Sequence, residues 1–212
     1  MKRLFVLLIL MLSLMLKAEI YPMFGEFPNR LSEEALSTPA VINEDSVTYI
    51  GVGSKDQIFY IITLDTVNVL PTEVVLEGSI SKPAAVMGDI FVVQTEDANL
   101  YLIDLSGDIE YSFNLGDISK YSAPVVFDGN KIACIADNSL FIIDEFYELR
   151  EIGTFHSEYG AVASPAAGDI DGDGEIEFIF PGWDIVYAFN VDGTTVEGFP
   201  DTLQGSWRFS YS

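Results

Sequence analysis

One short pattern occurs four times in the sequence, as STPAVI (37–42), SKPAAV (81–86), SAPVVF (122–127) and ASPAAG (163–168). The prolines of successive copies are 44, 41 and 41 residues apart. After each proline come a short apolar run, a turn, a second apolar run, and a third run that carries a polar residue near its end. These third runs align Thr63, Asp104, Asp144 and Asn190. The chain is therefore built from one unit of about 40 residues, used four times.

This unit predicts an all-β fold, a β-propeller of four-stranded blades. A period near 40 that holds about four short strands is typical of a propeller, in which each repeat forms one twisted sheet packed against its neighbours. The proline suits the first residue of a strand, where its missing N–H costs no ladder hydrogen bond. A β-sandwich is the rival all-β fold, but it does not explain a restart every 41 residues.

The repeats divide the chain into segments that we expect to form successive blades. Blade 1 is expected at 37–80, blade 2 at 81–121, blade 3 at 122–162 and blade 4 at 163–205, with a lead-in strand at 19–36 and the start of a truncated fifth blade at 206–212. The lead-in GEFPNRLSEEALSTP (25–39) resembles EGFPDTLQGSWRFSYS (197–212). Four blades can close a ring, but we expect an incomplete ring, a fragment of a longer propeller.

The first 18 residues have the layout of a secretory signal peptide. Lys2 and Arg3 precede an apolar run at 4–16, and Ala18 is a small residue near the expected cleavage site. The apolar run is too short to favour a stable membrane span, although an uncleaved anchor is the alternative. We therefore expect a secreted, cell-surface or periplasmic protein, with no membrane insertion after signal cleavage.

Acidic residues dominate the charge of the protein. The sequence has 33 Asp and Glu against 10 Lys and Arg, for a net charge of −23 at pH 7. Such a surface repels nucleic acid and anionic membranes, because both are bound by cationic patches. The one cysteine, Cys134, lies in the apolar run KIACIA (131–136). It allows no internal disulfide and is predicted to be a buried strand thiol.

One loop, in AAGDIDGDGEIEFIF (166–180), is longer and more acidic than its counterparts in the other repeats. Its pattern, D-x-D-x-D-G-x-x-E, consists of the carboxylates of Asp169, Asp171, Asp173 and Glu177, with Glu175 as a position that offers its backbone carbonyl. Alternate carboxylates converge on one point when the backbone curls, and Gly174 permits the sharp turn. The loop therefore predicts an oxygen cage for a hard cation.

Calcium is the cation that this cage fits best. Ca²⁺ takes 6–8 oxygen ligands in flexible geometry, whereas Mg²⁺ dehydrates reluctantly and prefers few protein ligands. Histidine and cysteine, which zinc and copper favour, are not near the loop. An EF-hand is excluded, because its twelfth position requires Glu and here is Phe180, between strands rather than helices. An ordinary solvated acidic turn is the alternative to a metal site.

The segment SPAAGDIDGDGEIEFIFPGWDIVYAFNVDGTTVEGFP (164–200) resembles the FG-GAP (VCBS, integrin α-type) propeller repeat. The resemblance places Asp169, Asp171, Asp173 and Glu177 on side-chain calcium ligands and Glu175 on a carbonyl ligand, with Glu rather than Asp at the ninth position as a departure. The first three repeats lack the acidic loop and are more similar to quinoprotein-type repeats, as in LIDLSGDIEYSF (102–113). The resemblance implies a secreted or surface-attached binding or adhesion module, not a catalyst.

Catalytic motifs are lacking in the sequence. His156 is the one histidine, and no G-x-S-x-G elbow accompanies it, so no nucleophile–base pair is indicated. We predict a calcium-binding, non-enzymatic propeller that binds an extracellular protein or carbohydrate. The alternative is a fragment of a quinoprotein-type or other propeller enzyme whose active site lies in further blades.

Overall fold

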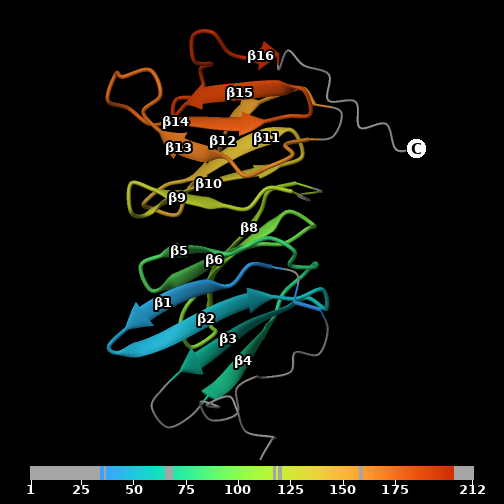
Figure 1. The fold of residues 1–212 in the computed structure, drawn as a ribbon, viewed down its shortest axis with the longest axis vertical. Coiled ribbons are helices and arrows are strands. Elements are labelled where there is room, and N and C mark those ends of the chain that lie inside the picture. The colour runs from blue at the N-terminus through green and yellow to red at the C-terminus, as the bar shows by residue number, and fades with distance from the viewer. Residues whose placement is uncertain are drawn as a thin grey trace, which may run out of the picture.

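The computed structural model describes residues 34–35, 37–64, 69–116, 118, 121–157 and 160–202. Within these ranges the chain forms sixteen β-strands in four sheets (Figure 1). The predicted signal peptide at 1–18 and the predicted fifth-blade start at 206–212 lie outside the described residues, as does most of the lead-in at 19–36. In the described part of the chain, no helix is long and apolar enough to cross a membrane.

Each sheet contains four consecutive strands in chain order, and all neighbouring strands pair antiparallel. Blade 1 consists of β1 (Ala40–Glu44), β2 (Val47–Gly53), β3 (Ile58–Leu64) and β4 (Val69–Val75). Blade 2 consists of β5 (Ala85–Met87), β6 (Ile90–Gln94), β7 (Asn99–Ile103) and β8 (Ile109–Asn114). Blade 3 consists of β9 (Val125–Phe127), β10 (Lys131–Ala136), β11 (Ser139–Ile143) and β12 (Leu149–Thr154). Blade 4 consists of β13 (Ala166–Gly168), β14 (Glu177–Pro181), β15 (Ile185–Asn190) and β16 (Asp201–Thr202).

The four blades are stacked in chain order, with blade 1 at one end of the molecule and blade 4 at the other (Figure 1). The first strands lie side by side, because β1 contacts β5, β5 contacts β9 and β9 contacts β13. These are the innermost strands of a propeller, and the fourth strands form its outer rim. The predicted fold class is thus confirmed as all-β, with four-stranded blades that form no closed ring within the described residues.

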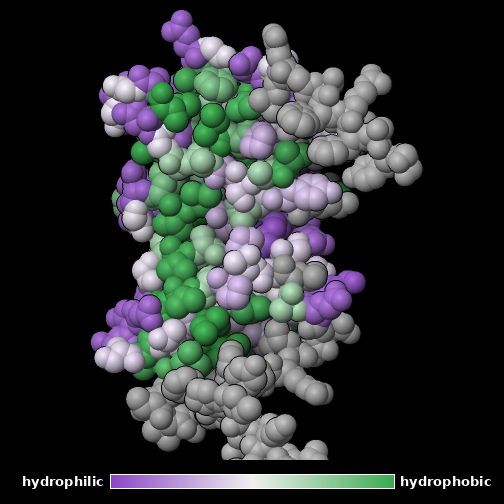
Figure 2. Space-filling view, viewed as in Figure 1, coloured by the Kyte–Doolittle hydropathy of each residue, from purple (hydrophilic) through white to green (hydrophobic). Residues whose placement is uncertain are grey.

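The core lies between successive blades, where their sheet faces meet. Three clusters of buried apolar side chains fill the interfaces between blades 1 and 2, blades 2 and 3, and blades 3 and 4. Aromatic pairs join neighbouring sheets, with ring centroids 5.4 Å apart for Phe59 and Phe91 and 4.9 Å apart for Phe127 and Phe178. Figure 2 shows that apolar side chains also form a continuous stripe over the first strands.

The outer strands carry features that hinder pairing with another chain at their free edges. Pro71 interrupts the row of N–H groups of β4, and the pairing of β8 with β7 and of β12 with β11 each contains a register shift. Proline and bulges both reduce edge-to-edge association. The outer strands of blades 1, 2 and 3 therefore each carry a feature that disfavours edge-to-edge association.

Candidate metal centre

The acidic loop connects the first two strands of blade 4. Gly168 pairs with Glu177, so residues 169–176 form the connection between β13 and β14. The same connection is much shorter in the other blades, at 45–46, 88–89 and 128–130. Blade 4 therefore has an enlarged loop on an otherwise regular hairpin.

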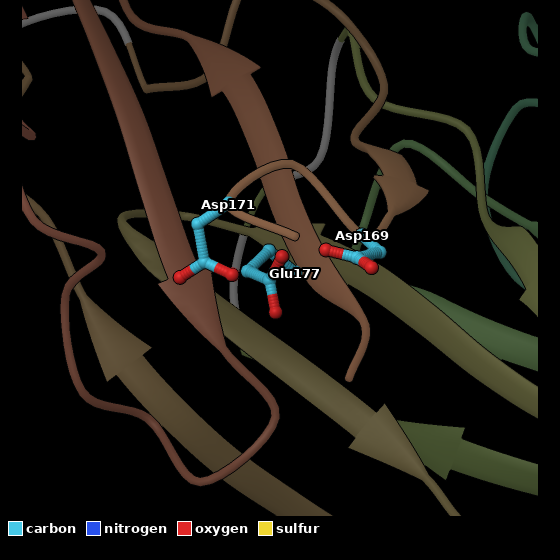
Figure 3. A group of neighbouring side chains, drawn as sticks. All are labelled: Asp169, Asp171 and Glu177. Atoms are coloured by element: carbon cyan, nitrogen blue, oxygen red, sulfur yellow. The ribbon is translucent and has the colours of Figure 1, made fainter. Parts of the chain in front are cut away.

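Three carboxylates of this region point toward one another (Figure 3). One carboxylate oxygen from each of Asp169, Asp171 and Glu177 lies within 4.8 Å of the other two. The strand sets the direction of Glu177, because its neighbour Phe178 packs toward blade 3 and successive side chains point to opposite faces. Glu177 therefore points to the face of β14 that is turned away from blade 3, beneath the loop.

Glu177 is fully buried, with 0% of its surface exposed. Its Oε2 accepts a hydrogen bond from the backbone N–H of Ile170 at 2.8 Å, whereas its Oε1 has no hydrogen-bond partner among the described residues. A buried carboxylate without compensation is costly, since removal from water disfavours the charged form. The unpartnered oxygen is therefore the feature of this site that most requires a ligand.

Local hydrogen bonds curl the loop around Asp169. Its Oδ1 accepts the N–H of Gly172 at 2.6 Å, and its Oδ2 accepts the N–H of Gly174 at 3.1 Å. Gly172 and Gly174 have φ angles of 85° and 92°, in the left-handed region that favours glycine. The two glycines thus allow the chain to fold back over Asp169, as the sequence predicts for Gly174.

Asp173 and Glu175 are not part of the converging group. The Oδ1 of Asp173 accepts the N–H of Glu175 at 2.8 Å, and both side chains are exposed. Of the four predicted side-chain ligands, the structure brings three together and leaves Asp173 at the outside of the loop, while the predicted role of the Glu175 backbone carbonyl stays a prediction. The burial of Glu177 gave no signal in the sequence, because it depends on how the loop folds over the strand.

The donor set fits a hard cation. All three converging groups are carboxylates, which are the ligands that calcium prefers, and two of them are exposed so that an ion can enter. A divalent cation at this point would supply a partner for Glu177 Oε1 and would neutralise the repulsion among the three negative charges.

A thiol and a lysine are also buried, both away from the loop. Cys134 is buried, as predicted, and burial raises the pKa of its thiol well above the usual range. Lys82 is only 5% exposed, and its Nζ donates to the backbone carbonyl of Thr95 at 3.1 Å. Burial lowers the pKa of Lys82 to about 8, although the nearby charges of Glu96 and Asp97 raise it in part. Sequence reasoning did not identify Lys82, which is an ordinary position in the repeat pattern.

Comparison with known proteins shows the fold and no family. No family model matches the sequence, and no curated protein matches it. Among solved structures, the chain is similar to the crystal structure of BamB from Moraxella catarrhalis, with a TM-score of 0.56 and 14% sequence identity. The match covers 79% of this chain and 53% of that one, so the chain spans about half the length of the structure that it resembles. This likeness supports the assignment of the protein to the β-propellers, and the finer FG-GAP resemblance stays a prediction.

Proposed function

We propose that this chain is a calcium-binding β-propeller that acts as a non-catalytic binding module of the cell envelope or the extracellular space. The observation that carries the calcium site is the buried Glu177, whose Oε1 has no partner among the described residues while Asp169 and Asp171 converge on it. The binding role is supported by the propeller fold, whose faces are built from loops that can vary without changing the blades.

The ion would have a structural role in this proposal. Asp169, Asp171 and Glu177 would hold it with side-chain oxygens, and the backbone of the loop is already curled around Asp169. The ion would neutralise the carboxylates and hold the loop against the start of β14. An affinity of about 10⁻⁴–10⁻³ M is typical of extracellular calcium modules, which suits an exported protein.

The non-catalytic role agrees with the chemistry of the side chains. The one thiol is buried with a raised pKa, which makes it a poor nucleophile. Export to the periplasm, the surface or the medium is supported by the signal-like N-terminus. An extracellular protein or carbohydrate is the proposed kind of partner.

Thermal unfolding with calcium and with chelator tests the proposal. A ligand that binds only the folded state raises the midpoint by mass action. With about 10 mM Ca²⁺ and the affinity above, the gain is about 1.4–2.7 kcal/mol, or a rise in Tm of about 3–10 °C. The variant Asp171→Asn should lose this response.

Asp192→Asn is the matched control, because Asp192 is an exposed aspartate in another turn of blade 4. It should respond to calcium like the parent. A cooperative melt of the parent that is the same in calcium and in chelator would show that the loop is only a solvated turn.

A further inference from the structure

The described turns lie on two opposite faces of the molecule, and both faces are acidic, but one carries the larger net negative charge. Because the strands of each blade are antiparallel, the turns after first strands and after third strands lie on the same face of the propeller. We name this the acidic face and define it by residues 45–46, 88–89, 104–108, 128–130, 144–148, 169–176 and 191–200. Each of these turns contains at least one carboxylate, and none contains lysine or arginine. Figure 2 shows hydrophilic side chains along the left edge, where Figure 1 places the β1–β2, β5–β6, β9–β10 and β13–β14 turns.

Three turns of this face have the same backbone hydrogen bonds. In blade 3, the N–H of Asp144 donates to the carbonyl of Glu148 at 3.2 Å, and the N–H of Tyr147 donates to the carbonyl of Asp144 at 3.0 Å. The same two bonds occur in blade 2, within 104–108, and in blade 4, within 190–194. Phe146 of blade 3 therefore occupies the position that Ser106 has in blade 2 and Asp192 has in blade 4.

Phe146 is an exception among these equivalent residues. Its side chain is 76% exposed, whereas a serine or an aspartate is the ordinary choice for such a position. The turn does not need a phenylalanine, since the two equivalent turns form without one. Phe146 belongs to none of the three core clusters of the described residues.

The turn nevertheless holds the backbone of Phe146 in place. The Oδ1 of Asp144 accepts the N–H of Phe146 at 3.0 Å and the N–H of Glu148 at 2.9 Å. The next residue, Tyr147, stacks on Tyr111 of blade 2 with ring centroids 4.1 Å apart. An apolar side chain on a backbone that is fixed in this way loses less entropy on binding than one on a mobile loop, which is a property of an interface anchor.

The charges around Phe146 are mostly negative, and Lys131 is the one cation that forms an ion pair there among the described residues. Glu145 and Glu148 flank it in the turn, and Lys131 lies 3.8 Å from Glu145 but is closer, at 3.3 Å, to Asp128. Arg150 pairs with Ile142, which packs toward blade 4, so Arg150 lies on the blade 4 side of the sheet. Its neighbour Leu149 lies on the opposite side and packs toward blade 2. Among the described residues, Glu148 has no ion-pair partner.

We propose that the acidic face is a docking surface for a basic segment of a partner protein, with Phe146 as its apolar anchor. Charge complementarity selects a segment rich in lysine or arginine, and Phe146 requires that this segment also carry an apolar side chain. The proposal names the partner of the binding module put forward above. It rests on that binding role and does not require calcium in the β13–β14 loop.

The test uses a fluorescein-labelled peptide of alternating arginine and leucine, titrated with the purified chain in fluorescence anisotropy. The variant is Phe146→Ser, which introduces the residue that the equivalent turn of blade 2 has. Val75→Ser is the matched control, because Val75 is 72% exposed and lies in β4, away from the acidic face. Thermal melts of all three proteins check that they are equally folded.

We expect Phe146→Ser to weaken peptide binding at least fivefold and Val75→Ser to leave it unchanged. Binding should also weaken in the charge variant Glu145→Gln/Glu148→Gln and as the salt concentration rises. Equal affinity of parent and Phe146→Ser would overturn the proposal, as would equal binding of a leucine–serine peptide without charge. Binding of cello- or chito-oligosaccharides that depends on Phe146, without binding of the basic peptide, would assign the surface to carbohydrate instead. If the melting midpoint still depends on calcium in any of these cases, only the docking proposal fails and the proposed metal site is retained.

Discussion

Tyr147 of the β11–β12 turn stacks on Tyr111 of β8, with ring centroids 4.1 Å apart and planes 22° from parallel. This contact joins blade 3 to the outer strand of blade 2. The equivalent turns of blades 2 and 4 also approach the outer strand of the preceding blade closely, through glycines rather than a ring. A Cβ added at Gly107, in the β7–β8 turn, would lie 2.7 Å from Thr72 Cγ2 of β4, and one added at Gly193 would overlap the carbonyl oxygen of Ile152 in β12. Each of these turns thus rests on the outer strand of the preceding blade.

Replacement of Tyr147 tests whether this contact holds the blades together. Tyr147→Ala removes the stacked ring and part of the apolar contact, and should lower the free energy of unfolding by about 1–3 kcal/mol. Tyr147→Phe retains the ring and should cost less than about 0.5 kcal/mol. Urea denaturation curves of the two variants measure the difference. Equal stability of the alanine and phenylalanine variants would show that the stack contributes nothing.

Gly193 tests the close approach of blade 4 to blade 3. Its φ angle is 91°, and an added Cβ would overlap the carbonyl oxygen of Ile152. Gly193→Ala should therefore destabilise the protein by more than about 2 kcal/mol, because both backbone strain and a clash arise. Gly88→Ala is the control, since Gly88 has a φ of 62° and open space around its Cα, so only the strain of about 1 kcal/mol applies. The measurement is the difference in unfolding free energy, and equal losses would contradict the clash.

Lys82 should make stability depend on pH. Its pKa is about 8 in the folded protein against 10.5 in the unfolded chain, so the unfolded state binds more protons between these values. Stability should therefore rise as the pH increases from about 8 toward 10, by an amount on the order of 1–3 kcal/mol. Burial raises the pKa values of Tyr101 and Tyr187, and their ionisation opposes this trend only at higher pH.

The free energy of unfolding, measured between pH 7 and pH 9.5, tests this effect. Lys82→Met should flatten the rise, whereas Lys55→Met, at an exposed lysine, should retain it. A parent protein whose stability is constant over this interval would mean that Lys82 keeps an ordinary pKa.

Glu177 offers a test that separates a metal site from a solvated turn. Without calcium, Glu177→Gln should be more stable than the parent by about 1–3 kcal/mol, because a neutral amide replaces a buried carboxylate without a full set of partners. With calcium, the same variant should gain less than the parent, since one ligand charge is lost. A variant that is destabilised in chelator would show that the buried charge is already compensated.

Most of the fold could be predicted from the sequence, because the repeat is local. The proline of each copy and the strands that follow it recur at a fixed period, and Asp104 and Asp144 follow directly after the third strands of their blades. Thr63 differs slightly, since it lies within β3, which continues to Leu64. Strand alternation and turn chemistry act over a few residues, which is why they can be read along the chain.

The candidate site was only partly predictable. The spacing of Asp169, Asp171 and Glu177 indicates their convergence, but Asp173 hydrogen-bonds to the N–H of Glu175 instead of joining the group. The burial of Glu177 depends on how the loop before it folds over β14, and the burial of Lys82 accompanies a hydrogen bond to Thr95, at the far end of β6. The exposure of Phe146 likewise gives no signal in the local sequence pattern, and its position is recognised only when the equivalent turns are compared.

Calcium binding to the purified chain, measured by equilibrium dialysis beside the Asp171→Asn variant, tests the central claim most directly. The account predicts one Ca²⁺ per chain with a Kd of about 10⁻⁴–10⁻³ M in the parent and loss of that site in the variant. Uptake that is absent in the parent, or that is the same in parent and variant, would contradict a metal centre formed by Asp169, Asp171 and Glu177.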